Sequence, residues 1–186
     1  QVISSPSNST PDSLLEMKDG VHQSVSKAIK KSGLNEKYSL KNYIVGDSNQ
    51  IAYAAAQAII DNLGEIYNPF FIHGKTGVGK THLAQAVGRA VLEQNPKRKV
   101  VYTPSEGFLN DMVYSIRTKK QFEFRNRYRN VDVLIIDDMQ LISKWVKTQD
   151  EFFNTFNELQ NNDAHIIMIS DRPPEEIKDL QDRLKT

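Results

Sequence analysis

The chain has 186 residues, of which 39% are hydrophobic and 25% are charged, and its formal net charge is +1 at pH 7. This composition predicts one ordinary globular domain. The small net charge excludes nucleic-acid binding through bulk basicity, so any such surface must be local. The absence of cysteine excludes disulfides and thiolate metal sites. No apolar run approaches the ~18 residues of a membrane-spanning helix, and we therefore expect a cytoplasmic protein with no membrane span.

The N-terminal residues predict a linker. Residues 4–13 are rich in serine and proline, a composition that cannot bury a core. We expect order to begin near Tyr38, which divides the chain into a largely flexible linker remnant, residues 1–37, and a folded core, residues 38–186. The chain begins with glutamine and ends inside a charged helical pattern, so both ends are expected to be cut from a longer protein.

A helix and a short strand are predicted next. Asp47 or Ser48 can cap a helix that reaches about Asn62, and its apolar positions recur with helical spacing. The apolar residues 69–73 then predict a short buried strand. The loop and helix before this strand could cover one side of the base if a nucleotide binds after the strand.

The strongest motif is a phosphate-binding loop at residues 74–81. Its sequence, Gly-Lys-Thr-Gly-Val-Gly-Lys-Thr, fits the P-loop pattern G-x-x-x-x-G-K-[ST] without a mismatch. The preceding strand and the following helix aim several backbone N–H groups at one anion, which disfavours a chance glycine-rich turn. Lys80 would contact the outer phosphates, and the Thr81 hydroxyl would bind Mg²⁺. The predicted nucleotide contacts of this region are Gly74, Lys75, Thr76, Gly77, Val78, Gly79, Lys80, Thr81 and His82.

A strand at residues 99–102 precedes two helical patterns. The first has an apolar stripe with Val113 at its edge, and the second, at about residues 121–129, combines basic and aromatic side chains. Basic groups with aromatic platforms suit a sequence-tolerant groove for single-stranded nucleic acid. A solvated basic face with its aromatic side chains in the core explains the same pattern, and the residues alone favour that alternative.

A second motif supports the phosphate site. Residues 131–136 form an apolar run that predicts a strand buried on both faces, and Asp137 and Asp138 follow it. Asp137 is the candidate to hold Mg²⁺, and Asp138 is the candidate to orient or deprotonate an attacking water. Many strands end in a solvated acidic turn, but the pairing of this doublet with a complete P-loop makes catalysis the better interpretation.

A helix at about residues 149–161 and a strand at residues 165–170 complete the pattern. Strands that alternate with helices predict an α/β fold with a parallel, doubly wound sheet and helices on both faces. Asp171 comes directly after the last predicted strand, where α/β proteins bind ligands. A turn residue before Arg172 and Pro173 is the alternative role for Asp171.

The sequence with these motifs resembles the AAA+ ATPase domain of the bacterial replication initiator DnaA. The resemblance runs from about Tyr38 to Thr186. Its generic motifs are the P-loop and the acidic doublet, and other segments are more particular to the family. These segments are Tyr43–Asn49, Asn68–Gly74, Asp132–Gln140, Ser170–Ile177 and Asp182–Leu184.

The resemblance implies a P-loop NTPase of the AAA+ type with a five-stranded sheet, in which the strand ending at Ser170 lies between the P-loop strand and the acidic strand. Asp171 would then be the sensor of the γ-phosphate and would act in catalysis with Lys80 and Asp138. The adenine of ATP or ADP would contact the segment that contains Asn42, Ile44, Val45 and Gly46.

The resemblance also assigns the two helices between Ser105 and Arg129 to an insertion that lines a path for single-stranded DNA in assembled initiators. The implied contacts are Val113, Arg125, Arg129 and Lys147. An arginine finger, a helical lid and a helix-turn-helix domain would follow Thr186, and a recruitment domain would precede Gln1.

The function implied is that of an ATP-dependent initiator. ATP and Mg²⁺ would drive a helical oligomer at origin DNA and open the duplex, and slow hydrolysis would reset it. Hydrolysis by these residues alone is expected to be very slow, and a replicative helicase would be contacted through regions outside the chain. The nearest alternative is a helicase loader or a DnaA-related regulatory AAA+ protein, although a loader would be expected to lack Tyr43–Asn49. A P-loop kinase would need an acceptor pocket and a lid, and a pure interaction module would have no need of Asp138.

Overall fold

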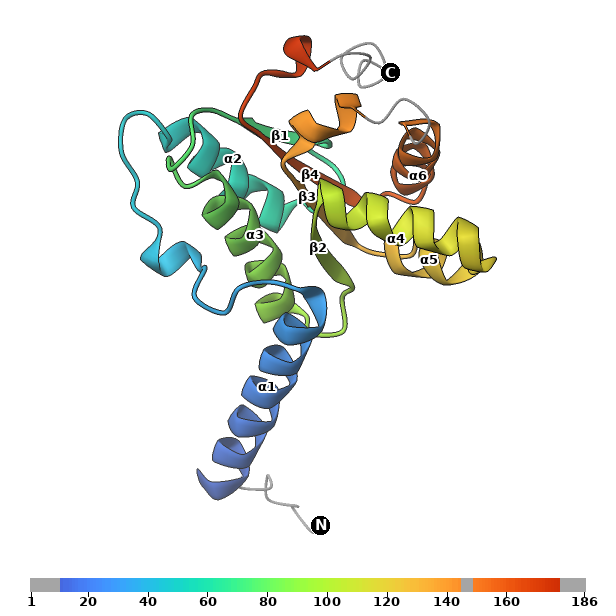
Figure 1. Ribbon diagram of the computed structural model, residues 1–186. Coiled ribbons are helices and arrows are strands. Elements are labelled where there is room, and N and C mark those ends of the chain that lie inside the picture. The colour runs from blue at the N-terminus through green and yellow to red at the C-terminus, as the bar shows by residue number, and fades with distance from the viewer. Residues whose placement is uncertain (1–10, 145–148, 178–186) are drawn as a thin grey trace.

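Four parallel strands form one sheet in the computed structural model, which describes residues 11–144 and 149–177 (Figure 1). The strands are β1 (Phe70–His73), β2 (Val100–Pro104), β3 (Val133–Asp137) and β4 (His165–Ser170). Their order in the sheet is β1-β4-β3-β2. The strand that ends at Ser170 therefore lies between the P-loop strand and the acidic strand, as predicted. Only four strands occur within the described residues, so the predicted five-stranded sheet is not confirmed.

Helices cover both faces of this sheet, which confirms the doubly wound α/β architecture. The helices are α1 (Pro11–Ser32), α2 (Gln50–Asp61), α3 (Lys80–Gln94), α4 (Ser105–Thr118), α5 (Gln121–Tyr128) and α6 (Gln149–Asn161). Short 3-10 turns are η1 (Leu40–Asn42), η2 (Met139–Lys144) and η3 (Pro174–Glu176). None of these helices, among the residues described, is both long and apolar enough to cross a membrane.

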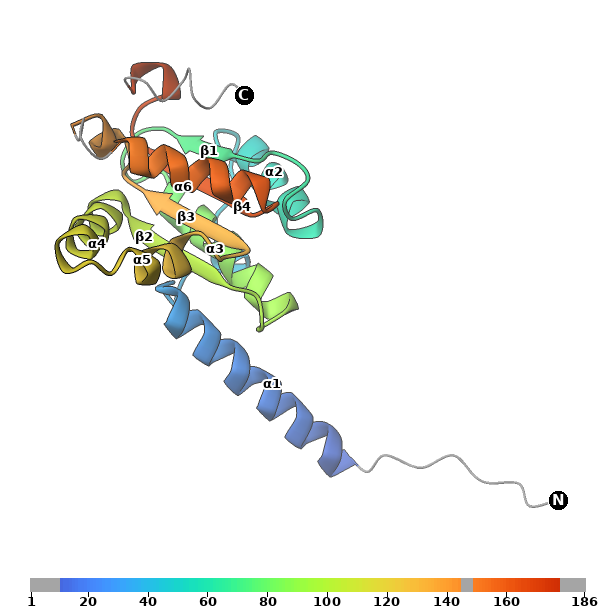
Figure 2. The ribbon, with the colours of Figure 1, turned by 90° about the vertical axis from the view of Figure 1, so that its right-hand side faces the viewer.

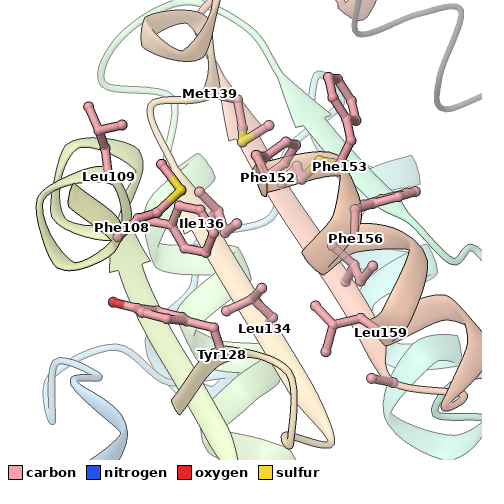
Figure 3. Close-up of a cluster of buried hydrophobic side chains, with 14 of the residues drawn as sticks. Phe108, Leu109, Tyr128, Leu134, Ile136, Met139, Phe152, Phe153, Phe156 and Leu159 are labelled. Atoms are coloured by element: carbon pink, nitrogen blue, oxygen red, sulfur yellow. The ribbon is translucent and has the colours of Figure 1, made fainter. Parts of the chain in front are cut away.

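The two faces of the sheet carry separate hydrophobic clusters because successive side chains of a strand point in opposite directions. Ile135 and Ile167 pack against α2, α3 and the end of α1. Leu134 and Ile136 pack against α4, α5 and α6, where Figure 3 shows aromatic side chains filling the space. Every residue of β3 and β4 is buried, which explains why the central strands are continuous apolar runs in the sequence.

Helix α1 extends away from the sheet, and only its C-terminal end reaches the core (Figure 2). Ile29 and Leu34 are 4% and 6% exposed, so packing begins before Tyr38, where the sequence analysis placed the start of order. Gly33, at a φ of 79°, ends the helix. The sequence analysis missed this contact because Ile29 and Leu34 are buried by α3 and the sheet, which are distant in the sequence.

Candidate nucleotide-binding site

The phosphate-binding loop joins β1 to α3. Gly77 and Gly79 have φ angles of 85° and 89°, in the left-handed region where a side chain would be strained. Gly79 immediately precedes α3, and its carbonyl oxygen accepts the N–H of Leu83 at 2.9 Å. The first turn of this helix therefore directs its free N–H groups at the loop, which is an arrangement that binds phosphate.

The ammonium group of Lys80 lies against the same loop. Its Nζ donates hydrogen bonds to the carbonyl oxygens of Gly74 and Lys75 at 2.7 and 2.9 Å. These bonds hold a positive charge beside the helix N-terminus. Charged phosphate oxygens make stronger hydrogen bonds than neutral carbonyls do, so a bound nucleotide would compete successfully for this ammonium.

Asp137 ends β3 next to the loop and is 7% exposed. Its Oδ2 accepts the Thr81 hydroxyl at 2.7 Å and the Tyr102 hydroxyl at 3.2 Å, and its Oδ1 accepts the N–H of Asp138 at 2.8 Å. The structure thus brings together the two residues predicted to bind Mg²⁺. Within the described residues no cluster of three or more His, Cys, Asp or Glu side chains is placed to hold a metal. Mg²⁺ at Thr81 and Asp137 would therefore take its other ligands from phosphate and water.

Tyr102 is a site residue that the sequence analysis missed. Burial, and then the Asp137 carboxylate, raise the pKa of Tyr102 well above its usual value, so the phenol stays protonated and acts as a donor. Gln85 of α3 also bonds Tyr102 and accepts the N–H of Asn35 at 2.8 Å. A strand tyrosine usually indicates packing, and only the pairing of β2 with β3 places this one beside Asp137.

The other two predicted catalytic acids, Asp138 and Asp171, follow neighbouring strands. Asp138 is exposed and has a φ of 59°, a conformation that is strained for a residue with a side chain and is common at functional sites. Its carbonyl oxygen accepts the hydroxyl of Ser105, the first residue of α4, at 2.8 Å. Asp171 is exposed, and its carboxylate lies 3.7 Å from the Arg172 guanidinium. Because β3 and β4 are adjacent and parallel, both acids lie at the edge of the sheet that carries the phosphate-binding loop.

The segment predicted to contact adenine lies against the loop. Tyr43 stacks on Tyr53 of α2, and a methyl group added to Gly79 would lie 3.2 Å from the Tyr43 ring. The Asn49 side chain fixes the segment by accepting the N–H of Gly46 at 2.8 Å and donating to the carbonyl of Ile44 at 3.0 Å. The apolar side chains of Ile44 and Val45 are 87% and 44% exposed. Tyr43 thus joins this segment to the P-loop, and the two neighbouring apolar side chains stay exposed.

His82 joins this segment to the first turn of α3. Its Nε2 lies 3.0 Å from the carbonyl oxygen of Ser39 and 3.1 Å from Oδ1 of Asn42. Its ring stacks on Tyr38 with 4.7 Å between centroids. Because both partners are oxygen acceptors, Nε2 carries the proton. In this structure the side chains of His82 and Asn42 bond each other, so their roles are to pack the segment onto α3.

The pair α4 and α5 contains two of the four residues predicted to contact single-stranded DNA, Val113 and Arg125. Arg125 is exposed, and Val113 is half-buried against the hydrophobic cluster of this face. Phe124 and Tyr128 are buried, as the alternative interpretation of this helix predicted, whereas Phe122 is 76% exposed. Lys147 lies outside the described residues.

The structure corrects the assignment of Arg129. Its side chain is 9% exposed, and its guanidinium pairs with Glu151 at 2.6 Å, with Glu158, and with the Thr155 hydroxyl at 3.2 Å. All these partners belong to α6. Because the guanidinium donates to these buried and half-buried acceptors, it is poorly placed to bind a phosphate. Arg129 instead joins the end of α5 to α6. Arg129 caps α5 one turn after Arg125, but α6 covers the Arg129 side chain and leaves that of Arg125 exposed.

Comparison with known proteins identifies the family. Residues 34–186 match the family model of the bacterial DnaA ATPase domain. The chain belongs to this family. The match includes the phosphate-binding loop, the acidic doublet and the strand that ends at Ser170, all at one edge of the sheet.

Solved structures of DnaA proteins have the same fold. Domain III of the Thermotoga maritima initiator is 45% identical, with a TM-score of 0.76 over 81% of this chain and 63% of that one. AMPPCP-bound DnaA from Aquifex aeolicus is 42% identical, with a TM-score of 0.76 over 81% of this chain and 47% of that one. DnaA bound to AMPPCP and single-stranded DNA gives the same four values. The chain thus spans about half to two thirds of the length of these relatives.

Proposed function

We propose that this chain is the ATP-binding core of a replication initiator. ATP with Mg²⁺ drives its assembly into a helical oligomer on origin DNA, and slow hydrolysis to ADP resets it. The observation that carries the proposal is the contact between Thr81 of the P-loop helix and Asp137 of the acidic strand. The AMPPCP bound to the relative from Aquifex aeolicus supports the choice of nucleotide.

Each part of the nucleotide has candidate partners. The backbone N–H groups of residues 74–82 bind the phosphates, and Lys80 neutralises the outer ones. Thr81 and Asp137 hold Mg²⁺, which screens the charge of the β- and γ-phosphates. The exposed apolar side chains of Ile44 and Val45, with backbone groups of Asn42 and Gly46, cover the adenine.

Hydrolysis requires groups beyond those that bind ATP. Asp138 orients the attacking water and accepts its proton, and Asp171 contacts the γ-phosphate from the end of β4. Groups from a neighbouring protomer would complete the charge stabilisation, as arginine fingers do in related phosphoryl-transfer enzymes. The reaction is therefore slow until the oligomer forms.

The exposed surface of α4 and α5 contacts single-stranded DNA in the oligomer. The relative bound to single-stranded DNA supports the choice of partner, and the exposed basic and aromatic side chains of α5 support the choice of surface. Arg125 supplies a phosphate contact, Phe122 supplies an exposed aromatic face, and Val113 and Lys147 remain candidates. Origin duplex and the replicative helicase are partners of the longer protein.

The test of nucleotide binding is calorimetric titration of ATP with Mg²⁺ into the parent chain, Lys80→Ala and Lys97→Ala. Lys80→Ala should abolish ATP binding because it removes the cation nearest the outer phosphates. Lys97 is exposed in the turn before β2, so Lys97→Ala is the matched control and should bind like the parent. Equal ATP affinity in all three proteins would refute the proposed site.

A further inference from the structure

The side-chain amide of Gln140 connects the two acids proposed to act in hydrolysis. Its Nε2 donates a hydrogen bond to Oδ1 of Asp138 at 3.1 Å. Its Oε1 accepts the Ser170 hydroxyl and the N–H of Asp171, each at 3.3 Å. Gln140 belongs to η2, directly after β3, so one side chain bridges the ends of two adjacent strands.

The chemistry of this bridge requires an amide. The Asp138 carboxylate can only accept, whereas the Ser170 hydroxyl and the Asp171 N–H donate. A neutral side chain that donates at one end and accepts at the other satisfies both. A glutamate would keep the accepting end and lose the donating one, and a methionine of similar length would lose both.

The carboxylate of Asp138 depends on such a support, although the backbone of the same residue is held in place. Its backbone is held at positive φ by Ser105 on its carbonyl and by Asp137 on its N–H. Its carboxylate, however, extends from an exposed residue. The Gln140 amide restricts this carboxylate to the side that faces the end of β4.

We propose that Gln140 is a positioning residue for ATP hydrolysis, which sets the Asp138 carboxylate at a fixed distance from Asp171. This inference rests on the proposed function, in which Asp138 activates water. In that step the water oxygen bonds to the γ-phosphorus, the bond from phosphorus to the oxygen that bridges to ADP breaks, and the water proton passes to the Asp138 carboxylate. The Gln140 amide acts through its bonds to Asp138 and to the end of β4, so we expect it to affect the rate of hydrolysis and to leave ATP affinity alone.

Two substitutions separate this role from a structural one. Gln140→Glu retains the oxygen that joins η2 to Ser170 and Asp171, but it replaces the donor to Asp138 with a second carboxylate oxygen. Gln140→Met removes both interactions. If Gln140 served only to hold β4 in place, Gln140→Glu would keep the parent rate. Gln94→Glu, an exposed change of the same charge at the far end of α3, is the matched control.

The experiment measures single-turnover hydrolysis and ATP affinity in the full-length protein. We expect both Gln140 variants to hydrolyse ATP about 10- to 100-fold more slowly, since a small misplacement of a catalytic group has effects of this size. Their ATP dissociation constants should stay within about twofold of the parent value. Gln94→Glu should match the parent in rate and affinity.

The possible failures are distinguishable. A Gln140→Glu variant that hydrolyses ATP at the parent rate would overturn the positioning role and leave the proposed function intact. A loss of ATP affinity as large as the loss of rate would also overturn it, because Gln140 would then act in binding. A parent protein that binds no ATP would refute the proposed function itself.

Discussion

The Thr81 hydroxyl donates a 2.7 Å hydrogen bond to the Asp137 carboxylate, although 56 residues separate them in the sequence. Thr81 lies in the first turn of α3, after the P-loop, and Asp137 ends β3, the acidic strand. The ammonium of Lys80, the residue before Thr81, bonds the carbonyl oxygens of Gly74 and Lys75 in the same loop. The fold therefore brings two candidate Mg²⁺ ligands from distant segments together beside the P-loop.

Asp137→Asn should remove most of the Mg²⁺ dependence of ATP binding. The amide keeps the shape of the side chain and loses the charge that a hard dication prefers. We expect the variant to bind ATP about equally with Mg²⁺ and with EDTA, while the parent protein binds more tightly with Mg²⁺. Titration of a fluorescent ATP analogue under both conditions measures this. Asp61→Asn, an exposed change at the end of α2, is the control, and a parent-like response in Asp137→Asn would contradict the metal assignment.

Arg129→Ala should destabilise the fold without acting on DNA directly. The change leaves Glu151 and Glu158 without their cation at a buried position. Since the two glutamates are partly exposed, we expect a loss of about 2 kcal/mol in the free energy of unfolding, below the range for fully buried pairs. Arg125→Ala should change it by less than about 0.5 kcal/mol because that side chain is exposed. Urea denaturation of both variants checks the contrast, and equal stabilities would show that the α5–α6 ion pairs contribute nothing.

Arg125→Ala should weaken single-stranded DNA binding by the assembled, ATP-bound protein. A lost phosphate contact lowers affinity across all sequences and reduces the salt slope of binding by about 1. Fluorescence anisotropy with a labelled oligonucleotide over a salt series measures both effects. Lys27→Ala, an exposed change on α1, is the matched control. Affinity and salt slope equal to those of the parent would show that Arg125 is a solvated surface residue and not a DNA contact.

His165 should make the protein less stable as the pH falls. It is fully buried, its Nδ1 accepts the N–H of Gly64 at 3.2 Å, and its Nε2 has no hydrogen-bond partner among the described residues. Burial lowers the pKa of His165 from 6.5 to about 4. Between these values the unfolded chain takes up a proton that the folded chain refuses, so the contribution is complete above pH 6.5 and is lost toward pH 4.

The pKa difference of His165 corresponds to about 3 kcal/mol over this window, at about 1.4 kcal/mol per pKa unit. Urea denaturation between pH 7.5 and 4.5 should therefore show a steeper loss of stability in the parent than in His165→Gln. The variant should be less stable at pH 7.5, because the buried imidazole at the start of β4 accepts the N–H of Gly64. Parallel pH profiles for the two proteins would show that the buried imidazole does not titrate as expected.

Gly88→Ala should destabilise the contact between α3 and the sheet. A methyl group at this position would lie 2.8 Å from the Ile135 side chain and 3.1 Å from the Val100 side chain. Overpacking a core costs about 1–3 kcal/mol, which outweighs the gain of up to about 1 kcal/mol from replacing glycine in a helix. Gly20→Ala on α1 meets nothing within 4 Å and should not be destabilising. Melting temperatures of both variants test this prediction. A Gly88→Ala variant more stable than the parent would show that the Ile135 and Val100 side chains can move to accept the methyl group.

The sequence by itself determined the parts of this protein that depend on contiguous residues. Eight consecutive residues specify the P-loop, because its glycines permit the backbone turn and its last two residues supply the cation and hydroxyl. Apolar runs and helical spacing placed the four strands and most helices. The acidic doublet was recognised because it ends a buried strand. The position of β4 between β1 and β3 came from the family resemblance, since periodicity does not encode strand order.

Only the tertiary structure decided which side chains from distant segments meet. The sequence indicated only a packing role for Tyr102, and the pairing of β2 with β3 places its hydroxyl on Asp137. The sequence indicated no role for the side chain of Gln140, and the fold places its amide between the residues that follow β3 and β4. The family resemblance made Arg129 a candidate DNA contact, yet α6 presents two carboxylates to it. Ile29 was assigned to a linker from the sequence, but in the structure it is buried in the cluster that contains α3. A side chain's role depends on the groups that surround it in three dimensions, and local composition cannot report neighbours that come from elsewhere in the chain.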